Sequence, residues 1–182
     1  MSNKNVETIN IMNEIDVSMA NQIIRKIADI KEDIANNKTN PKVIIEIHIN
    51  SSGGDVDAVL SIISALKYSG MEIHTYAYGD VSSAAFIIYC FGEKRFATIY
   101  SQFMYHRFRC IINNNTLSNH DNFIKHVENK QTLTDNLIIA NTLIPGDTLK
   151  IYENSAWYID IKEAIELKIC THIASANDLK LT

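Results

Sequence analysis

Residues 43–54 read VIIEIHINSSGG, and this stretch decides the fold. Its first part, residues 43–49, is a short β-branched run of the kind found in strands that are covered on both faces. The Asn-Ser-Ser-Gly-Gly sequence then breaks the run, and apolar residues recur after it with the period of a helix: Val56, Leu60, Ile63 and Leu66. The stretch predicts a buried strand, a glycine turn and a helix.

The same alternation continues in both directions along the chain. It predicts further strands at residues 6–12, 71–78, 95–100, 103–106 and 169–173. It predicts helices at residues 16–36, 82–91, 120–143 and, for one or two turns, 160–167. Asp16 or Ser18 is expected to cap the first of these helices. Strands that alternate with helices of this length predict an α/β fold with a mainly parallel sheet.

Length and composition restrict the class of protein. A chain of 182 residues fits a single domain, residues 1–182, and a net charge of −4 argues against a nucleic-acid partner. No apolar run reaches the roughly 18 residues of a membrane helix, and the first residues lack a signal peptide's apolar stretch. Cys90, Cys110 and Cys170 are far apart and are expected to be reduced thiols, so the sequence predicts a cytoplasmic protein without a membrane partner.

Three local features carry candidate chemistry, and each has a plainer interpretation. The Gly53-Gly54 pair can present backbone N–H groups to a negative charge at a helix start, or can simply make a turn. In residues 79–85, GDVSSAA, Ser83 either exposes its hydroxyl at a strand-to-helix junction or caps the helix. His106 ends a predicted strand, where a packed or surface histidine is also common. His48 and His74 lack a carboxylate at a matching spacing, so neither a metal nor another cofactor is expected.

Taken together, these features resemble the Clp protease family of serine peptidases. Residues 49–54, INSSGG, are similar to the family motif I-N-S-P-G-G, with Ser52 in place of the proline. Residues 79–85 resemble G-Q-A-A-S-M-G, with Ser83 at the nucleophile position, and residues 92–97, GEKRFA, resemble G-E-K-R-x-A. Residues 103–106, FMYH, resemble the strand that ends in the catalytic histidine. The resemblance extends from about residue 6 to residue 173.

The resemblance implies a fold and an activity. The fold is the Clp peptidase and crotonase fold, with repeated ββα units, a mainly parallel sheet and a protruding long helix, the handle, at about residues 120–144. The activity is serine endopeptidase cleavage of unfolded polypeptides or short peptides, in which Ser83 attacks the peptide carbonyl and His106 is the base. The backbone N–H groups of Gly54 and Ala84 then form the oxyanion hole. Residues 55–56 (Asp55 and Val56) pair with the extended polypeptide substrate.

The resemblance also implies a homo-oligomer, as a heptameric ring or a double ring. Two segments depart from the family's pattern for assembly. The segment before the first strand, residues 1–5, is shorter than the one that docks the family's AAA+ unfoldase, which argues against ATPase coupling. Residues 107–115 contain no glycine, whereas the family has a glycine-rich strand there that contacts the opposite ring.

The third catalytic position departs from the family as well. Counting back from Glu163 and Ala164, Ala156 occupies the position of the family's catalytic Asp. Three interpretations follow: another residue orients His106, the enzyme works slowly with Ser and His alone, or the chain is an inactive ring subunit with a structural or regulatory role. The candidates for the first are Glu153, Asn154 and Asp160. A hydratase or isomerase of the crotonase type is a further alternative, for which Asp80 is the nearby carboxylate.

Overall fold

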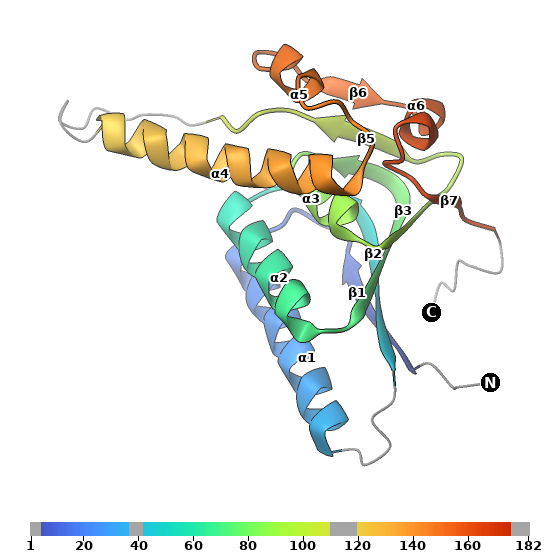
Figure 1. Ribbon diagram of the computed structural model, residues 1–182. Helices are drawn as coiled ribbons and strands as arrows, with labels where there is room; N and C mark the ends of the chain where they lie inside the picture. The colour runs from blue at the N-terminus through green and yellow to red at the C-terminus, as the bar shows by residue number, and fades with distance from the viewer. Residues whose placement is uncertain (1–4, 37–41, 110–119, 176–182) are drawn as a thin grey trace.

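The computed structural model describes residues 5–36, 42–109 and 120–175. Its strands form one sheet, shown in Figure 1. Within it lie, in spatial order, β1 (Asn5–Ile11), β2 (Val43–Ser51), β3 (Glu72–Ser82), β4 (Lys94–Ala97) and β7 (His172–Ile173). Two more strands extend the sheet, since β5 (Gln102–Tyr105) pairs with β3 and β6 (Trp157–Ile159) pairs with β5. Every pairing is parallel except that of β5 with β6, which confirms the predicted α/β fold with a mainly parallel sheet.

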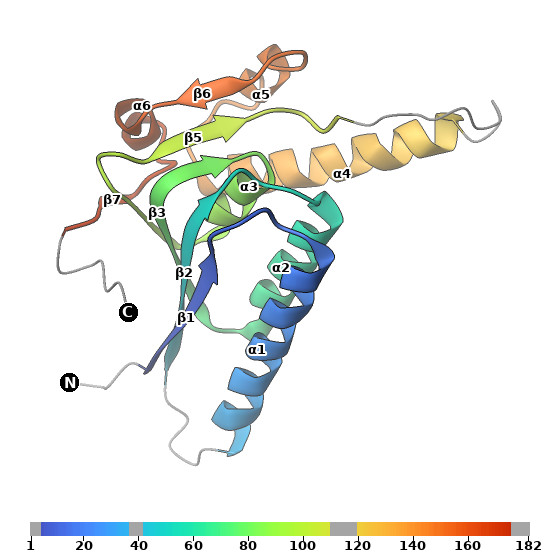
Figure 2. The same cartoon turned by 180° about the vertical axis from the view of Figure 1, so that it is seen from behind.

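The helices are α1 (Val17–Asn36), α2 (Val56–Ser69), α3 (Ala84–Phe91), α4 (His120–Asn141) and the short α5 (Thr148–Ile151) and α6 (Ile161–Glu166). In Figures 1 and 2, α1 and α2 lie side by side against one face of the sheet, and α4 projects well beyond it. The predicted cap of the first helix is Asp16, whose carboxylate accepts a hydrogen bond from the Met19 N–H at 2.7 Å. Among the described residues, no helix is long and apolar enough to span a bilayer.

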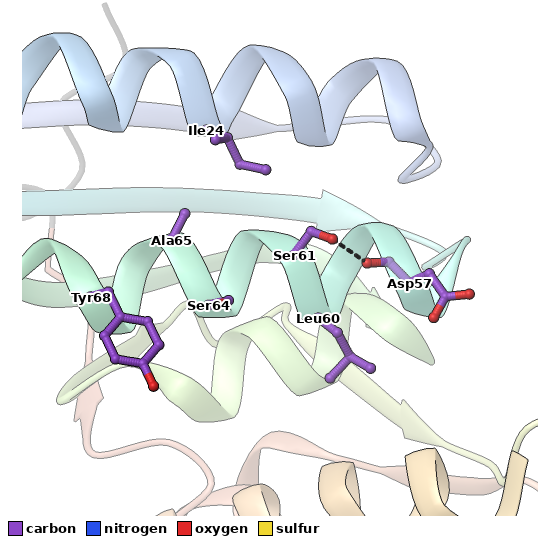
Figure 3. Close-up of a pocket in the computed structure, with 7 residues that line it drawn as sticks. All are labelled: Ile24, Asp57, Leu60, Ser61, Ser64, Ala65 and Tyr68. Atoms are coloured by element: carbon purple, nitrogen blue, oxygen red, sulfur yellow. Dashed lines mark hydrogen bonds between the residues drawn. The ribbon is translucent and has the colours of Figure 1, made fainter. Parts of the chain in front are cut away.

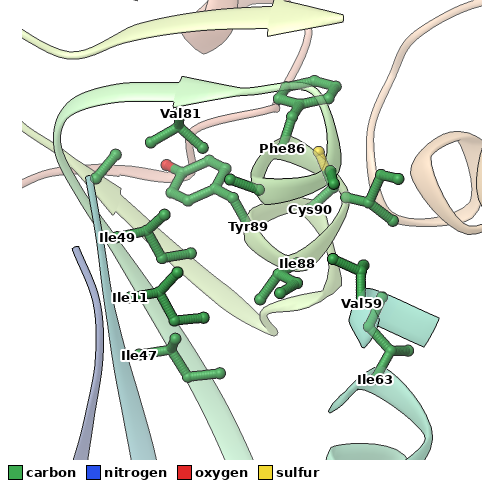
Figure 4. Packing of buried hydrophobic residues seen from close by; sticks show 14 of the residues in the cluster. Ile11, Ile47, Ile49, Val59, Ile63, Val81, Phe86, Ile88, Tyr89 and Cys90 are labelled. Atoms are coloured by element: carbon green, nitrogen blue, oxygen red, sulfur yellow. The ribbon is translucent and has the colours of Figure 1, made fainter. Parts of the chain in front are cut away.

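The core fixes the start of α3 against the sheet. Alternate residues of β2 point toward the helices, and Ile45, Ile47 and Ile49 are completely buried. Figure 4 shows the side chains of α3 in the same cluster as the isoleucines of β1 and β2: Phe86, Ile88, Tyr89 and Cys90. Burial of each large apolar side chain contributes roughly 1.5–3 kcal/mol. The turn that leads into α3 is therefore held between a rigid strand and a buried helix.

The structure differs from the prediction in elements whose existence or bounds depend on pairing between distant segments. β3 runs to Ser82, beyond the predicted end at residue 78, because its residues 80–82 pair with β5. Neither α5 nor β6 was predicted, since they are four and three residues long and depend on their neighbours. β4 and β7 are shorter than predicted, and α3 begins at Ala84 rather than at residue 82.

A buried arginine, Arg95, joins the ends of three helices. Its guanidinium donates to the carbonyl oxygen of Gly92, after α3, at 2.6 Å, and to that of Asn141, at the end of α4, at 2.6 Å. It also donates to the carbonyl oxygens of Lys168 and Ile169, after α6, at 2.7 and 2.8 Å. The carbonyl groups at a helix end have no partner within the helix. The planar array of donors on Arg95 therefore satisfies carbonyl groups that would otherwise be unpaired in the interior.

The sheet face opposite the helices carries a row of stacked rings. His48 stacks on Tyr76 and Tyr78 with ring centroids 4.8 and 5.3 Å apart, and Tyr76 stacks on Phe96 at 4.6 Å. The imidazole of His48 is buried, and its Nδ1 lies 2.5 Å from the Tyr78 hydroxyl. Desolvation lowers the pKa of His48 below its ordinary value, although the negative charge of Glu46 acts in the opposite direction.

The expectation that His48 and His74 lack nearby carboxylates was wrong. Nε2 of His74 lies 2.8 Å from Oε1 of Glu72, and Nε2 of His48 lies 3.8 Å from Oε2 of Glu46. In each case the glutamate precedes the histidine by two residues, which places both side chains on the same face of a strand. Within residues 5–36, 42–109 and 120–175, no group of three or more His, Cys, Asp or Glu side chains is arranged to hold a metal ion.

The cysteines whose positions the structure describes are free thiols in the interior. Cys90 and Cys170 are both buried. Burial raises the pKa of Cys90 to about 12, which keeps it protonated. Cys110, residues 1–4 and residues 110–115 of the glycine-free segment lie outside the described residues.

Candidate active site

Ser83 has an unusual backbone conformation at the junction of β3 and α3. Its φ of 54° and ψ of −121° are rare for a residue with a side chain, and holding them costs roughly 1–3 kcal/mol. Its N–H donates to the carbonyl oxygen of Met104 in β5 at 2.7 Å. Although Ser83 occupies the cap position of α3, its hydroxyl makes no capping hydrogen bond. The plainer interpretation, a helix-capping serine, therefore does not account for this residue.

The Gly53-Gly54 turn packs directly against this junction. Both glycines have positive φ values, 102° and 144°. A Cβ atom on Gly53 would lie 2.9 Å from the Ala84 nitrogen. The Ile15 N–H donates to the Gly53 carbonyl oxygen at 2.7 Å, and the Asp55 N–H donates to the Ile15 carbonyl oxygen at 2.8 Å. These two hydrogen bonds make a parallel bridge between Ile15 and the turn. Gly54 lies between the two bonded residues of the turn, and its N–H points away from Ile15.

Two backbone N–H groups are thus available beside Ser83. Ala84 is the first residue of α3, where an N–H has no partner within the helix. The partial positive charge of a helix N-terminus adds to the attraction that these N–H groups exert on an anion. Together with the N–H of Gly54, the junction can stabilise an oxyanion that forms on a group attached to Ser83.

His106 directly follows β5, at the same edge of the sheet. The register of β3 and β5 pairs Ser82 with Met104, so Ser83 and His106 leave adjoining parallel strands at their carboxyl ends. Nδ1 of His106 lies 2.6 Å from the carbonyl oxygen of Arg107. Because a carbonyl oxygen can only accept, Nδ1 must carry the proton in the neutral ring. The lone pair is then on Nε2, which is the form required of a general base.

Ala156, the position that the resemblance assigns to the third catalytic residue, lies at the end of the antiparallel pair of β5 and β6 where His106 also lies. That pair matches Met104 with Tyr158 and Tyr105 with Trp157, so the next pair in register is His106 with Ala156. In the part of the chain that the structure describes, no carboxylate oxygen lies within 4 Å of a ring nitrogen of His106.

The carboxylates considered from the sequence are engaged elsewhere. Oε1 of Glu153 lies 3.7 Å from a guanidinium nitrogen of Arg107. Oδ1 of Asp160 accepts from the Glu163 N–H at 2.9 Å and caps α6, while Asn154 is exposed. Asp80, the carboxylate of the crotonase-type alternative, accepts a hydrogen bond from the hydroxyl of Ser82.

The two residues expected to contact substrate begin α2. Val56 is the first residue of the helix, and the carboxylate of Asp55 accepts from the Ala58 N–H at 2.8 Å. Because the Asp55 N–H already donates to Ile15, the backbone groups of this turn that remain for a peptide are centred on Gly54.

A polar cluster beside His106 was not predicted. Oδ1 of Asp135 accepts from the Tyr105 hydroxyl and from Nε2 of Gln131, both at 2.8 Å. Oε1 of Gln131 accepts from the Phe108 N–H at 2.8 Å. The signal in the sequence is the spacing of Gln131 and Asp135, which are one helical turn apart and face the same way.

A groove of about 580 Å³ lies between α1 and α2. Figure 3 shows that its lining side chains come from these two helices, among them Ile24, Leu60 and Tyr68, and that none comes from the turn at Ser83. The groove is therefore separate from the candidate active site.

The chain is similar to proteins of a known family. The chain matches the Clp protease family over residues 3–177. It is 29% identical over 96 residues to the ATP-dependent Clp protease proteolytic subunit 2 of Chlamydia abortus and 30% identical over 96 residues to that of Chlamydia pneumoniae. It is also 28% identical over 96 residues to proteolytic subunit 1 of Chlamydia felis. Each match covers 52% of this chain and 44% of the relative. The chain belongs to the Clp protease family.

Proposed function

We infer that this chain is a serine endopeptidase subunit of a Clp-type protease, with Ser83 as the nucleophile and His106 as the general base. The observation that carries this inference is the conformation of Ser83, whose positive φ holds it at the start of a buried helix without a capping role. Residues held in such conformations are concentrated at active sites, where the surrounding structure maintains the strain.

The reaction follows from the groups around the junction. His106 takes the proton of the Ser83 hydroxyl through Nε2 as the oxygen attacks the peptide carbonyl carbon. The carbonyl oxygen becomes an oxyanion, which the N–H groups of Gly54 and Ala84 stabilise. His106 then gives the proton to the leaving amine, and water releases the acyl group by the reverse sequence of steps. No metal or cofactor is needed for this chemistry.

The proposed substrate is an extended polypeptide, and the proposed assembly is a homo-oligomeric ring, heptameric in the family. Support for the assembly comes from α4, which projects beyond the sheet and leaves large apolar side chains exposed: Phe123 by 43%, Ile124 by 43% and Leu133 by 57%. Exposed apolar surface of this kind is typical of contacts between protein chains.

One observation favours a second candidate function, that of an inactive ring subunit with a structural or regulatory role. Ala156 directly precedes β6 at the end where His106 directly follows β5, and its methyl group could not orient the imidazole. An inactive subunit would keep the ring contacts and would not need the strained conformation of Ser83.

A fluorophosphonate probe distinguishes the two candidates, because it reacts only with an activated serine. Mass spectrometry of the labelled protein should locate the probe on Ser83, and turnover of a fluorogenic peptide should fall to background in Ser83→Ala. Ser82→Ala is the matched control, since Ser82 is the adjacent serine and its hydroxyl bonds to Asp80. Absence of labelling in an assembled wild-type ring would favour the inactive subunit, and turnover that survives Ser83→Ala would rule out the proposed mechanism.

A further inference from the structure

A continuous series of hydrogen bonds leads from His106 to the carboxylate of Asp135. Nδ1 of His106 lies 2.6 Å from the carbonyl oxygen of Arg107, which belongs to the same peptide group as the N–H of Phe108. That N–H donates to Oε1 of Gln131 at 2.8 Å. Nε2 of Gln131 donates to Oδ1 of Asp135, also at 2.8 Å. Two amide groups, one from the backbone and one from a side chain, therefore connect the imidazole to a carboxylate.

The direction of every bond in this series is determined by its partners. The Phe108 N–H can only donate, so it must face the oxygen of the Gln131 amide, and the Gln131 NH₂ group then faces the carboxylate. In a planar trans peptide group the N–H and C=O point in opposite directions. By holding the Phe108 N–H, Gln131 aims the Arg107 carbonyl toward His106.

The cluster is sheltered from water, which strengthens its interactions. Gln131 and Tyr105 are each only 3% exposed. Burial and the nearby Asp135 carboxylate raise the pKa of Tyr105, so its hydroxyl remains a donor to Asp135. In such surroundings, hydrogen bonds in series polarise one another, and a negative charge at one end makes the oxygen at the other end a better acceptor.

We propose that Gln131 and Asp135 of α4 are positioning residues that do for His106 what a carboxylate at position 156 would do. Gln131 holds the Arg107 carbonyl where it fixes the proton on Nδ1, and Asp135 supplies the negative charge that favours the imidazolium during the reaction. This proposal rests on the proposed function of Ser83 and His106, and it assigns to α4 a role in the active site of its own subunit.

The tautomer of His106 tests the proposal without requiring activity. The chemical shifts of the two imidazole nitrogens report which of them carries the proton, and they can be measured in Ser83→Ala at neutral pH. Gln131→Met keeps the length of the side chain but cannot accept from Phe108, so the Nδ1–H form should lose its predominance. Thr134→Val is the matched control, because it removes a buried hydroxyl from the same stretch of α4, one that donates only to the backbone carbonyl oxygens of Lys130 and Gln131, and leaves the series intact. An unchanged tautomer in Gln131→Met would overturn the proposal.

Peptide turnover tests the electrostatic part. Asp135→Asn keeps an acceptor for Gln131 and Tyr105 but removes the charge, so kcat should fall about tenfold with KM unchanged. Gln131→Met should lower kcat about 100-fold, and Thr134→Val should stay within about twofold of wild type. A loss in Thr134→Val equal to that in Asp135→Asn would show that only stability matters and would overturn the proposal. A failure of the proposed function itself would give a different result. Wild type would then neither react with the fluorophosphonate probe nor cleave the peptide, while the tautomer of His106 would still respond to Gln131→Met.

Discussion

A Cβ atom on Gly53 would lie 2.8 Å from the Cβ of Ser83, and 2.8 Å from the carbonyl oxygen of Ser82. The turn after β2 and the junction before α3 are therefore in direct contact. Only a residue without a side chain at position 53 allows so close an approach. Two segments 30 positions apart, joined at Gly53 and Ser83, form one structural unit. Their mutual position determines where the backbone N–H groups lie relative to the serine hydroxyl.

We predict that Gly53→Ala lowers the rate of fluorophosphonate labelling at Ser83 by at least about tenfold, since displacements near an ångström cost activity steeply. Gly70→Ala is the matched control. Gly70 also has a positive φ, 74°, but an added Cβ there would meet nothing within 4 Å. It should cost about 1 kcal/mol of stability and leave the labelling rate unchanged. Equal labelling by both variants would contradict the close contact of Gly53 with Ser83.

A second prediction concerns Arg95, which connects the ends of α3, α4 and α6. Arg95→Met should lower the free energy of unfolding by about 3 kcal/mol or more, because several buried carbonyl groups lose their donors. Arg95→Lys should recover only part of this loss, since an ammonium group cannot reproduce the planar array of donors. The measurement is denaturant unfolding at a fixed protein concentration. Lys150→Gln, which removes an exposed partner of Asp147, is the control and should change stability by less than about 0.5 kcal/mol.

The features predictable from the sequence are those with a local cause. The apolar run and glycine pair of residues 43–54 predicted β2, its turn and α2 because each element is specified by adjacent residues. Asp16 was predictable as a cap for the same reason. The strand that ends before His106 was predictable in the same way, whereas the extension of β3 to Ser82, which places Ser83 beside it, depends on pairing with β5.

The features that were missed depend on partners distant in the sequence. β6 exists because Trp157 and its neighbours pair with β5, and Arg95 finds its acceptors 46 to 74 positions away as well as nearby. Gln131 bonds to a backbone N–H 23 positions earlier, which no periodicity reveals. The glutamates beside His48 and His74 are a different case, because their two-residue spacing was visible in the sequence and was overlooked.

A third prediction concerns pH. Burial lowers the pKa of His48 in the folded protein below its ordinary value of about 6.5. The unfolded chain therefore binds a proton more readily, and stability that is fully present above about pH 6.5 is lost as the pH falls through that value toward the folded pKa. Between about pH 7.5 and 5.5, the unfolding temperature of wild type should fall more than that of His48→Phe, which keeps the stacked ring but cannot take a proton. Parallel pH dependence of the two proteins would contradict this assignment.

A fourth prediction concerns assembly. Light scattering during size-exclusion chromatography should give a mass several times the 20.6 kDa of one chain. Replacement of Phe123 and Leu133 of α4 by serine should shift the population toward smaller species, because both side chains are exposed and apolar. Tyr68→Ser, on the groove between α1 and α2, removes a still more exposed aromatic side chain and should leave the mass unchanged. A stable monomer at micromolar concentration would rule out the ring.

The last prediction joins Ala156 to the series of bonds that ends at Asp135. Because positions 156 and 106 both adjoin the Tyr105–Trp157 pair, the new carboxylate of Ala156→Asp should compete with the Arg107 carbonyl for the proton on Nδ1. Loss of the triad acid costs about 10⁴-fold in turnover when the tautomer is lost with it. In wild type the tautomer is already held, so Ala156→Asp should raise kcat by only about tenfold, through the better stabilisation of the imidazolium.

The same substitution should have a larger effect where that support is missing. In the Gln131→Met background, Ala156→Asp restores both the tautomer and the negative charge, so we expect a gain of about 100-fold or more in kcat. Ser155→Asp places a carboxylate one residue earlier, on an exposed position outside this register, and is the control in both backgrounds. Equal gains in the two backgrounds would show that the carboxylate and Gln131 act independently. A larger gain in Gln131→Met means that the two act on the same proton of His106, because only then does the presence of one reduce the benefit of the other.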